Sequence, residues 1–290
     1  MNSIIKKALE YTPILILLIF CIIIHFSDIP PIQRGFFCKD YTLKYPYIEN
    51  ERIPHYFCVI IWLSLTILIV GTTEIISKSA LIEKKIKCFL LGLFSCLFIT
   101  DILKYSVGKF RPYFLTLCNP DYSTICIDES AYYTIDGDDE QHFDEFFQKY
   151  VFSNKMDICR NDTIAHMKEP HLSFISGHAS FSFYFASFLM LYTNTNTTKI
   201  KFLKNFVSMI QVLVFIVACW ISISRINDYQ HHPQDVVFGG ILGLVTSFSF
   251  NINQFSLNVP VDCESSKSQH AHSTTTKGDV TENLSIPSIE

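Results

Sequence analysis

Six separate runs of mostly apolar residues dominate this sequence, and each is about 17 to 25 residues long, the length that a helix needs to cross a bilayer. Charged residues make up only 17% of the 290 residues, whereas soluble domains carry roughly a quarter. The sequence therefore predicts an all-α, polytopic integral membrane protein with six transmembrane helices. We place them near 11–27, 54–77, 86–104, 173–193, 205–225 and 235–252.

The six helices form one predicted domain over residues 1–253, with a long loop at 105–172 and a polar tail at 254–290. The tail has no apolar period, so we expect it to be disordered. Lys6 and Lys7 could begin a secretory signal, but no small-residue cleavage site follows the first run. This favours a retained anchor helix.

Lysines in the short loops predict the orientation, because cytosolic loops are enriched in Lys and Arg. These lysines lie before the first apolar run, after the second run and after the fourth run. Both termini should then be cytosolic, and loops 28–53, 105–172 and 226–234 should face the lumen or the cell exterior. The lysines are Lys6, Lys7, Lys78, Lys84, Lys85, Lys87, Lys199, Lys201 and Lys204.

Four helix ends on the predicted outer side carry polar residues that hydropathy does not explain. Ionisable residues at membrane depth are costly, and by default they mark a functional site. The sequence therefore predicts that a site lies where the third and fifth helices end and the fourth and sixth begin. Its members are Lys104, Arg111, Ser176, Gly177, His178, Arg225, His231 and Asp235.

Five of these residues suit a phosphate group. Lys104, Arg111 and Arg225 would bring three cations to one polyanion, and the Arg fork matches phosphate oxygens. Ser176 and Gly177 lie where the fourth helix begins, and the unpaired N–H groups of a helix start bind anions. Together they predict a phosphate cradle.

The remaining three residues suit chemistry at phosphorus. One histidine can attack the phosphorus atom and a second can protonate the leaving oxygen. Asp235 follows His231 by four residues, so we expect its carboxylate to accept the ring N–H of His231 and to fix the tautomer. His178 is then the candidate acid.

Each residue also has an ordinary structural explanation. Lys104 and Arg111 could reach the membrane interface from helix ends, and His178 could pack between helices. His231 and Asp235, with the adjacent His232, could bind a metal, but three cations beside a metal would repel it. Taken together, however, these separate explanations do not account for the fact that all the groups fall on one membrane face.

Three spaced motifs resemble the signatures of the type 2 phosphatidate phosphatases, the lipid phosphate phosphatase family. Lys104 is followed by six residues and then Arg111-Pro112, and Ser176-Gly177-His178 forms the second motif. Ser224-Arg225, five residues, His231, three residues and Asp235 form the third. The stretches "KYSVGKFRPYF", "SFISGHASFS", "SRINDYQHH" and "RGFFCKDYTLKYPY" are similar to the animal enzymes, so the resemblance covers about residues 1–255.

The resemblance implies a role for each matching residue and an acid-phosphatase-like helical core. His231 is implied as the nucleophile that forms a phosphohistidine, Asp235 as the residue that orients it, and His178 as the general acid. The implied phosphate-binding residues are Lys104, Arg111, Ser176, Gly177 and Arg225.

The resemblance also implies what the protein acts on and where. The implied substrates are phosphatidate, lysophosphatidate, sphingosine 1-phosphate and ceramide 1-phosphate, hydrolysed without a metal or cofactor at the extracellular or lumenal leaflet. We expect the plasma membrane, with the endoplasmic reticulum or Golgi as alternatives, and a role in phospholipid metabolism and signalling. The net charge of −4 gives no support for a nucleic-acid partner.

Other functions on the same fold stay open at this stage. A sphingolipid head-group transferase shares the histidine chemistry but lacks the Lys104–Arg111 motif, and a phosphatase of soluble substrates fits the animal-type stretches poorly. A non-catalytic lipid-binding relative would lack reacting groups that are present here. Gly239, Gly240 and Gly243 suit close helix packing and would permit a homo-oligomer.

The chain departs from the family pattern at Ile175 and Pro233, beside two motifs, and in the long outer loop. Residues 128–145 contain eight acidic residues and no Lys or Arg, which favours a solvated insertion over a charged lid. Asn161 begins a sequon in this loop, so we expect it to be glycosylated.

Four of the ten cysteines lie in the predicted outer loops, where an oxidising compartment permits disulfides. Sequence does not determine their pairing, and Cys118 with Cys126 is the first expectation. The other two are Cys38 and Cys159.

Overall fold

The computed structural model describes residues 3–77, 82–126, 150–151, 158–160, 167–197 and 203–256. The chain divides into two units, Met1–Ser256 and Leu257–Glu290, and all the described helices and strands belong to the first. The predicted glycosylation at Asn161, the acidic stretch 128–145 and the tail beyond Ser256 lie outside the described residues.

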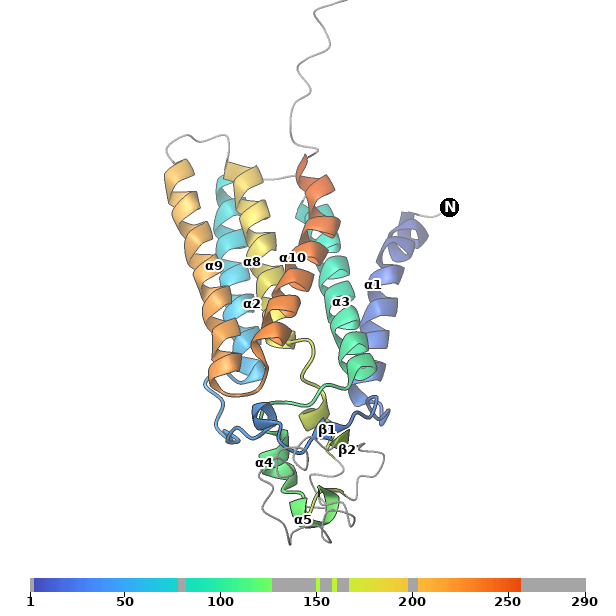
Figure 1. The fold of residues 1–290 in the computed structure, drawn as a ribbon. Helices are drawn as coiled ribbons and strands as arrows, with labels where there is room; N and C mark the ends of the chain where they lie inside the picture. The colour runs from blue at the N-terminus through green and yellow to red at the C-terminus, as the bar shows by residue number, and fades with distance from the viewer. Residues whose placement is uncertain are drawn as a thin grey trace, which may run out of the picture. The chain divides into compact units, whose positions relative to one another are not determined.

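In the described part of the chain, six long helices lie side by side in a bundle (Figure 1). Each overlaps one predicted apolar run, and most extend past it, because hydropathy marks only the apolar part of a helix. The sixth helix continues past residue 253, where we expected the tail to begin. The helices are α1 Ser3–Phe26, α2 His55–Ser77, α3 Ile82–Val107, α8 Gly177–Thr197, α9 Leu203–Asn227 and α10 Pro233–Ser256.

Four of these helices are long and apolar enough to cross a membrane: α1, α2, α3 and α9. The helices α8 and α10 carry more Ser, Thr, Asn and Gly. Helix α8 is mostly buried against other helices, so it tolerates more polar residues than a lipid-facing helix does, and glycines of α10 lie against α8. The count of six membrane spans therefore stays a prediction.

Helix α8 occupies the centre of the bundle, where it packs against α2, α3, α9 and α10. The main apolar core forms around it from Trp62, Tyr184, Phe185 and Leu189, all with almost no exposed surface. Large apolar side chains on α1, α2, α9 and α10 point outward instead. Such an apolar exterior is what lipid requires.

Two glycines let α10 approach the backbone of α8. A Cβ at Gly239 would lie 2.5 Å from the carbonyl oxygen of Ser176, and one at Gly243 would lie 2.3 Å from that of Ser180. Both distances are too short for any side chain. The expectation that these glycines serve close helix packing is confirmed.

Short elements form a small cap at the end of the bundle where α3 ends and α10 begins (Figure 1). Strands β1 Phe36–Phe37 and β2 Tyr150–Val151 pair antiparallel. A second apolar cluster includes Phe36, Phe110 and Phe114. The other short elements of this cap are η1 Tyr41–Leu43, α4 Phe114–Cys118, α5 Tyr122–Ile125 and η4 Glu169–His171.

Two disulfides fasten the cap, and the expected pair Cys118–Cys126 is wrong. Cys38 pairs with Cys126, and Cys118 pairs with Cys159. An isolated bridge between Pro120 and Cys159 brings residue 159 beside the end of α4. The first disulfide joins cysteines that are 88 positions apart in the sequence, and the second joins cysteines that are 41 positions apart. The fold brings them together, and their spacing in the sequence does not reveal it.

Gly243→Ala should destabilise the protein, because the new methyl group would force α10 away from α8. Overpacking a tight interface typically costs about 1–3 kcal/mol. We expect the apparent unfolding temperature in detergent, followed by size-exclusion of heated samples, to fall by several degrees.

Gly71→Ala in α2 is the matched control, since no atom lies within 4 Å of the position of its Cβ. Alanine is the better helix former by about 1 kcal/mol, so this variant should unfold at the same or a higher temperature. Equal destabilisation by both changes would contradict the proposed role of Gly243.

Candidate active site

The predicted site residues lie at the end of the bundle where α3 and α9 end and α8 and α10 begin (Figure 1). This is also the end that carries the disulfide-fastened cap. Lys104 and Arg225 lie in last helical turns, Gly177, His178 and Asp235 in first turns, and Arg111, Ser176 and His231 in the segments between helices.

His231 is buried, and its ring is oriented by a backbone carbonyl. Its Nδ1 lies 2.7 Å from the carbonyl oxygen of Ser173. A carbonyl can only accept, so in a neutral imidazole Nδ1 carries the proton and Nε2 keeps the lone pair. Burial, reinforced by the positive charges of Arg111 and Lys104, lowers the pKa of His231 well below 6.5. The ring is therefore neutral at pH 7 and can act as a nucleophile through Nε2.

Asp235 does not make the contact with His231 that the four-residue spacing predicts. Its buried carboxylate accepts from Lys109 Nζ at 2.7 Å, from Ser173 Oγ at 2.6 Å and from the backbone N–H of His232 at 3.1 Å. The first turn of α10 directs the carboxylate toward Ser173 rather than toward the ring. Asp235 therefore positions His231 through Ser173, whose carbonyl holds Nδ1.

Arg111 is buried, and two neighbours hold its guanidinium. Nη1 donates to the side-chain oxygen of Gln230, and Nη2 forms an ion pair with Glu169. The Arg111 charge outweighs burial and holds the pKa of Glu169 below its usual range. The Nε atom of Arg111 is buried without a hydrogen-bond partner among the described residues.

Arg225 is even more deeply enclosed, with 1% of its side chain exposed. It donates from Nη1 to Glu51 at 2.8 Å, from Nη2 to Asp228 at 3.2 Å and from Nε to Ser224 Oγ at 3.1 Å. A guanidinium has five N–H donors, so these three bonds fix its plane and leave two donors for another group.

The start of α8 lies next to Lys104. A Cβ at Gly177 would lie 3.6 Å from Lys104 Nζ, so the small glycine keeps the space beside the ammonium open. The first N–H groups of a helix have no acceptor within the helix. The amides of Gly177 and His178 therefore remain available beside this cation.

Ser176 contributes differently from the prediction. Its backbone N–H, which we expected to face a phosphate, donates to the carbonyl oxygen of Asp235 at 3.0 Å. Its hydroxyl is a weak cap for the N–H of Ala179 at 3.5 Å. Ser176 thus joins α8 to α10, and the adjacent Gly177 supplies the open helix start.

Several buried donors and acceptors at this site lack a partner within the described part of the chain. They include Arg111 Nε and His178 Nε2, and no hydrogen bond or ion pair of Lys104 occurs there either. Buried polar groups in native proteins are nearly always satisfied. Their convergence beside a helix start indicates a place for an anionic ligand.

Sequence reasoning missed several residues that build the site. Ser173, Glu169 and Gln230 contact Asp235 or Arg111. Each lies within seven residues of a recognised motif, which was the available signal. Glu51 comes from the loop before α2, far from every motif. His55, the first residue of α2, meets His178 edge to face with ring centroids 5.2 Å apart.

Among the described residues, no group of three or more His, Cys, Asp or Glu side chains is placed to hold a metal ion. The alternative of a metal bound by His231, His232 and Asp235 finds no support in their contacts. His232 Nε2 lies 3.2 Å from the carbonyl oxygen of Phe110, and the Asp235 carboxylate is engaged by Lys109.

Comparison with known proteins gives one family and several relatives. The model of the PAP2 superfamily matches residues 85–256. Phospholipid phosphatase 1 of Rattus norvegicus is 33% identical over 232 residues, which are 75% of this chain and 73% of that protein. Phospholipid phosphatase 2 of Bos taurus is 28% identical over 241 residues, 78% of this chain and 75% of that protein. No solved structure matches significantly.

Lys109→Gln should destabilise the protein, because it leaves the carboxylate of Asp235 buried without its cation. Breaking such a pair from one side costs about 3–5 kcal/mol when both partners are buried. With 24% of the Lys109 side chain exposed, we expect a loss on the order of 2 kcal/mol, measured as a lower unfolding temperature in detergent.

The double variant Lys109→Gln/Asp235→Asn should recover much of this loss, since the uncompensated charge is gone. Simple addition of the two single effects would instead show that the ion pair does not matter for stability.

Proposed function

The chain belongs to the PAP2 superfamily, and on that basis we propose that it is a membrane-embedded phosphatase that hydrolyses lipid phosphate monoesters. The observation that carries this proposal is the set of buried, unpartnered donors beside the start of α8. Lys104, the Nε of Arg111 and the amides of Gly177 and His178 offer positive charge and N–H groups to one phosphate.

The first step is attack of His231 Nε2 on phosphorus. The P–N bond forms as the P–O bond to the lipid breaks. His178, which becomes protonated once the negative charge of the phosphate lies beside it, gives its proton to the leaving oxygen. The products of this step are a lipid alcohol and a phosphohistidine. The carbonyl of Ser173 stabilises the charge that develops on the His231 ring, since it accepts from Nδ1.

In the second step water attacks phosphorus and the P–N bond breaks. The water gives its proton to His178, which regains the form in which it began. Arg111 and Arg225 are held in place before substrate arrives, so their charge stabilises the transferring phosphoryl group without rearrangement. No metal takes part in either step.

The substrates are proposed to be phosphatidate, lysophosphatidate, sphingosine 1-phosphate and ceramide 1-phosphate. The printed names of the relatives specify phospholipids as a class. Helices α1, α2 and α9 support a membrane location, because they combine length with high hydropathy. A lipid held by its acyl chains at the end of this bundle presents its phosphate to the site.

The site is proposed to face the cell exterior or an organelle lumen, with both termini cytosolic. The two disulfides in the cap support this orientation, because disulfides persist in oxidising compartments. Lys84 and Lys87 near the start of α3, and Lys204 at the start of α9, belong to the opposite end of the helices, as a cytosolic side enriched in Lys requires. The plasma membrane is the proposed membrane.

His231→Ala should abolish release of phosphate from phosphatidate in mixed micelles while the protein stays folded, because the nucleophile is missing. Wild-type protein quenched with alkali after mixing with ³²P-phosphatidate should carry a label that is stable in alkali and lost in acid. Assays contain excess chelator, and activity should persist in it. His272→Ala in the tail is the control and should behave as wild type.

Residual turnover by His231→Ala near the wild-type rate, or labelling of that variant, would assign the nucleophile to another residue. Complete loss in chelator that magnesium restores would refute the metal-free mechanism.

Asn161→Gln should remove the N-linked glycan and abolish the mobility shift that a glycosidase produces in the wild-type protein. The sequons at Asn196 and Asn283 are predicted to be cytosolic, so Asn283→Gln is the matched control and should leave the shift unchanged. A shift that is lost in Asn283→Gln and kept in Asn161→Gln would reverse the proposed orientation.

A further inference from the structure

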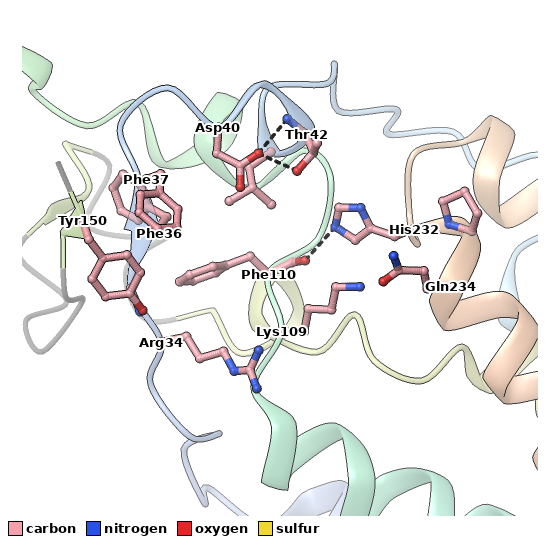
Figure 2. Close-up of a pocket in the computed structure, with 13 residues that line it drawn as sticks. Arg34, Phe36, Phe37, Asp40, Thr42, Lys109, Phe110, Tyr150, His232 and Gln234 are labelled. Atoms are coloured by element: carbon pink, nitrogen blue, oxygen red, sulfur yellow. Dashed lines mark hydrogen bonds between the residues drawn. The ribbon is translucent and has the colours of Figure 1, made fainter. Parts of the chain in front are cut away.

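A separate cavity of about 590 Å³ lies in the cap, between β1, η1 and the first turn of α10 (Figure 2). The proposed chemistry does not use it, although Lys109 and His232 on its wall belong to the hydrogen-bond network of Asp235. Its further wall residues include Arg34, Phe36, Asp40, Thr42, Phe110 and Gln234.

The floor of this cavity is apolar. Phe36, Leu43 and Phe110 line it and are almost completely buried. Phe37 and Tyr150 meet edge to face with centroids 5.0 Å apart and lie toward the opposite end of the cavity from Lys109 and Gln234 (Figure 2). The cavity can thus hold an apolar group as well as a polar one.

The polar part of the wall carries more positive than negative charge. Arg34 is exposed, and no ion pair or hydrogen bond of its guanidinium occurs within the described residues. Lys109 has 24% of its side chain exposed beside its ion pair with Asp235. The carboxylate on this wall, Asp40, accepts from the N–H and hydroxyl of Thr42.

These groups favour an anion with tetrahedral oxygens. An Arg fork and a Lys ammonium recognise phosphate together, and the Gln234 amide at the start of α10 adds hydrogen-bond capacity on the same wall. We propose that this cavity is a second anion site, which binds the phosphate of a lipid headgroup or a free phosphate between Arg34 and Lys109.

Occupancy of this second anion site would act on the candidate active site through Lys109. An anion that draws the ammonium toward Arg34 weakens its 2.7 Å contact with Asp235. Asp235 holds Ser173, whose carbonyl positions His231. The bound anion should therefore lower the turnover number, whereas an anion in the phosphate cradle competes with substrate and raises KM.

Inorganic phosphate is the first probe. Assayed with phosphatidate in mixed micelles, it should both raise the apparent KM and lower kcat of the wild-type protein. Arg34→Gln should weaken the effect on kcat at least fivefold, since it removes a charge-assisted hydrogen bond to the anion, and should leave the effect on KM unchanged. Arg160→Gln is the matched control, a cap arginine whose ion pair is with Asp121.

Phosphatidylglycerol is the second probe, because a phosphodiester is not a substrate of a monoesterase. If the natural ligand is a lipid headgroup, this lipid should lower kcat in an Arg34-dependent way at concentrations where free phosphate does not. If the natural ligand is free phosphate, free phosphate should lower kcat in an Arg34-dependent way at concentrations where phosphatidylglycerol does not. The absence of any Arg34-dependent effect on kcat with both probes would overturn the proposal.

A binding measurement keeps this test independent of the proposed activity. ³¹P relaxation of inorganic phosphate should report binding to His231→Ala protein, which does not turn over. Binding that survives Lys104→Gln/Arg225→Gln should disappear when Arg34→Gln is added. If the cradle changes have no effect but Arg34→Gln does, the proposed function fails and the second anion site stands. If Arg34→Gln has no effect, the second site fails.

Discussion

The buried carboxylate of Asp235 is the interaction on which the rest of the site depends. With none of its side chain exposed, a carboxylate stays ionised only if charge and hydrogen bonds replace its hydration. Lys109 supplies the charge, and Ser173 supplies a hydroxyl. The backbone carbonyl oxygen of Asp235 accepts a hydrogen bond from the N–H of Ser176. One residue thus joins the segment after α3, the segment before α8 and the start of α10, and His231 is positioned through that junction.

Close packing of α8 and α10 makes this junction geometrically attainable. Gly239 faces the carbonyl oxygen of Ser176 so closely that a Cβ would lie 2.5 Å from it. At that separation the first turn of α10 lies against the first turn of α8, and the Asp235 carbonyl comes within 3.0 Å of the Ser176 N–H. Glycines make α10 less apolar than the helices that qualify as membrane spans. The same glycines let α10 approach α8 and so bring the two motifs together.

The sequence predicts the long helices and the grouping of the motifs because both depend on local or topological properties. The length of an apolar run predicts a membrane-spanning helix. A chain that crosses a membrane repeatedly alternates between the two sides, and this alternation determines which helix ends lie on the same side. The contacts of Asp235 and the partners of Cys126 depend on side-chain direction and on loop paths, which no spacing encodes. The four-residue interval from His231 to Asp235 predicted a contact between the two side chains, and this prediction is wrong, because the carboxylate contacts Lys109, Ser173 and the backbone of His232 instead.

Glu51 and Glu169 explain how the two arginines remain buried when no substrate is present. Arg225 and Arg111 have 1% and 5% of their side chains exposed, and a buried guanidinium without a counter-charge costs several kcal/mol. The carboxylates provide that charge and hold each guanidinium plane in position. Under the proposed function, a phosphate that enters would share the arginines with these carboxylates, so part of its attraction would be offset. The same sharing would favour departure of inorganic phosphate after hydrolysis, which a cradle of unopposed cations would retain.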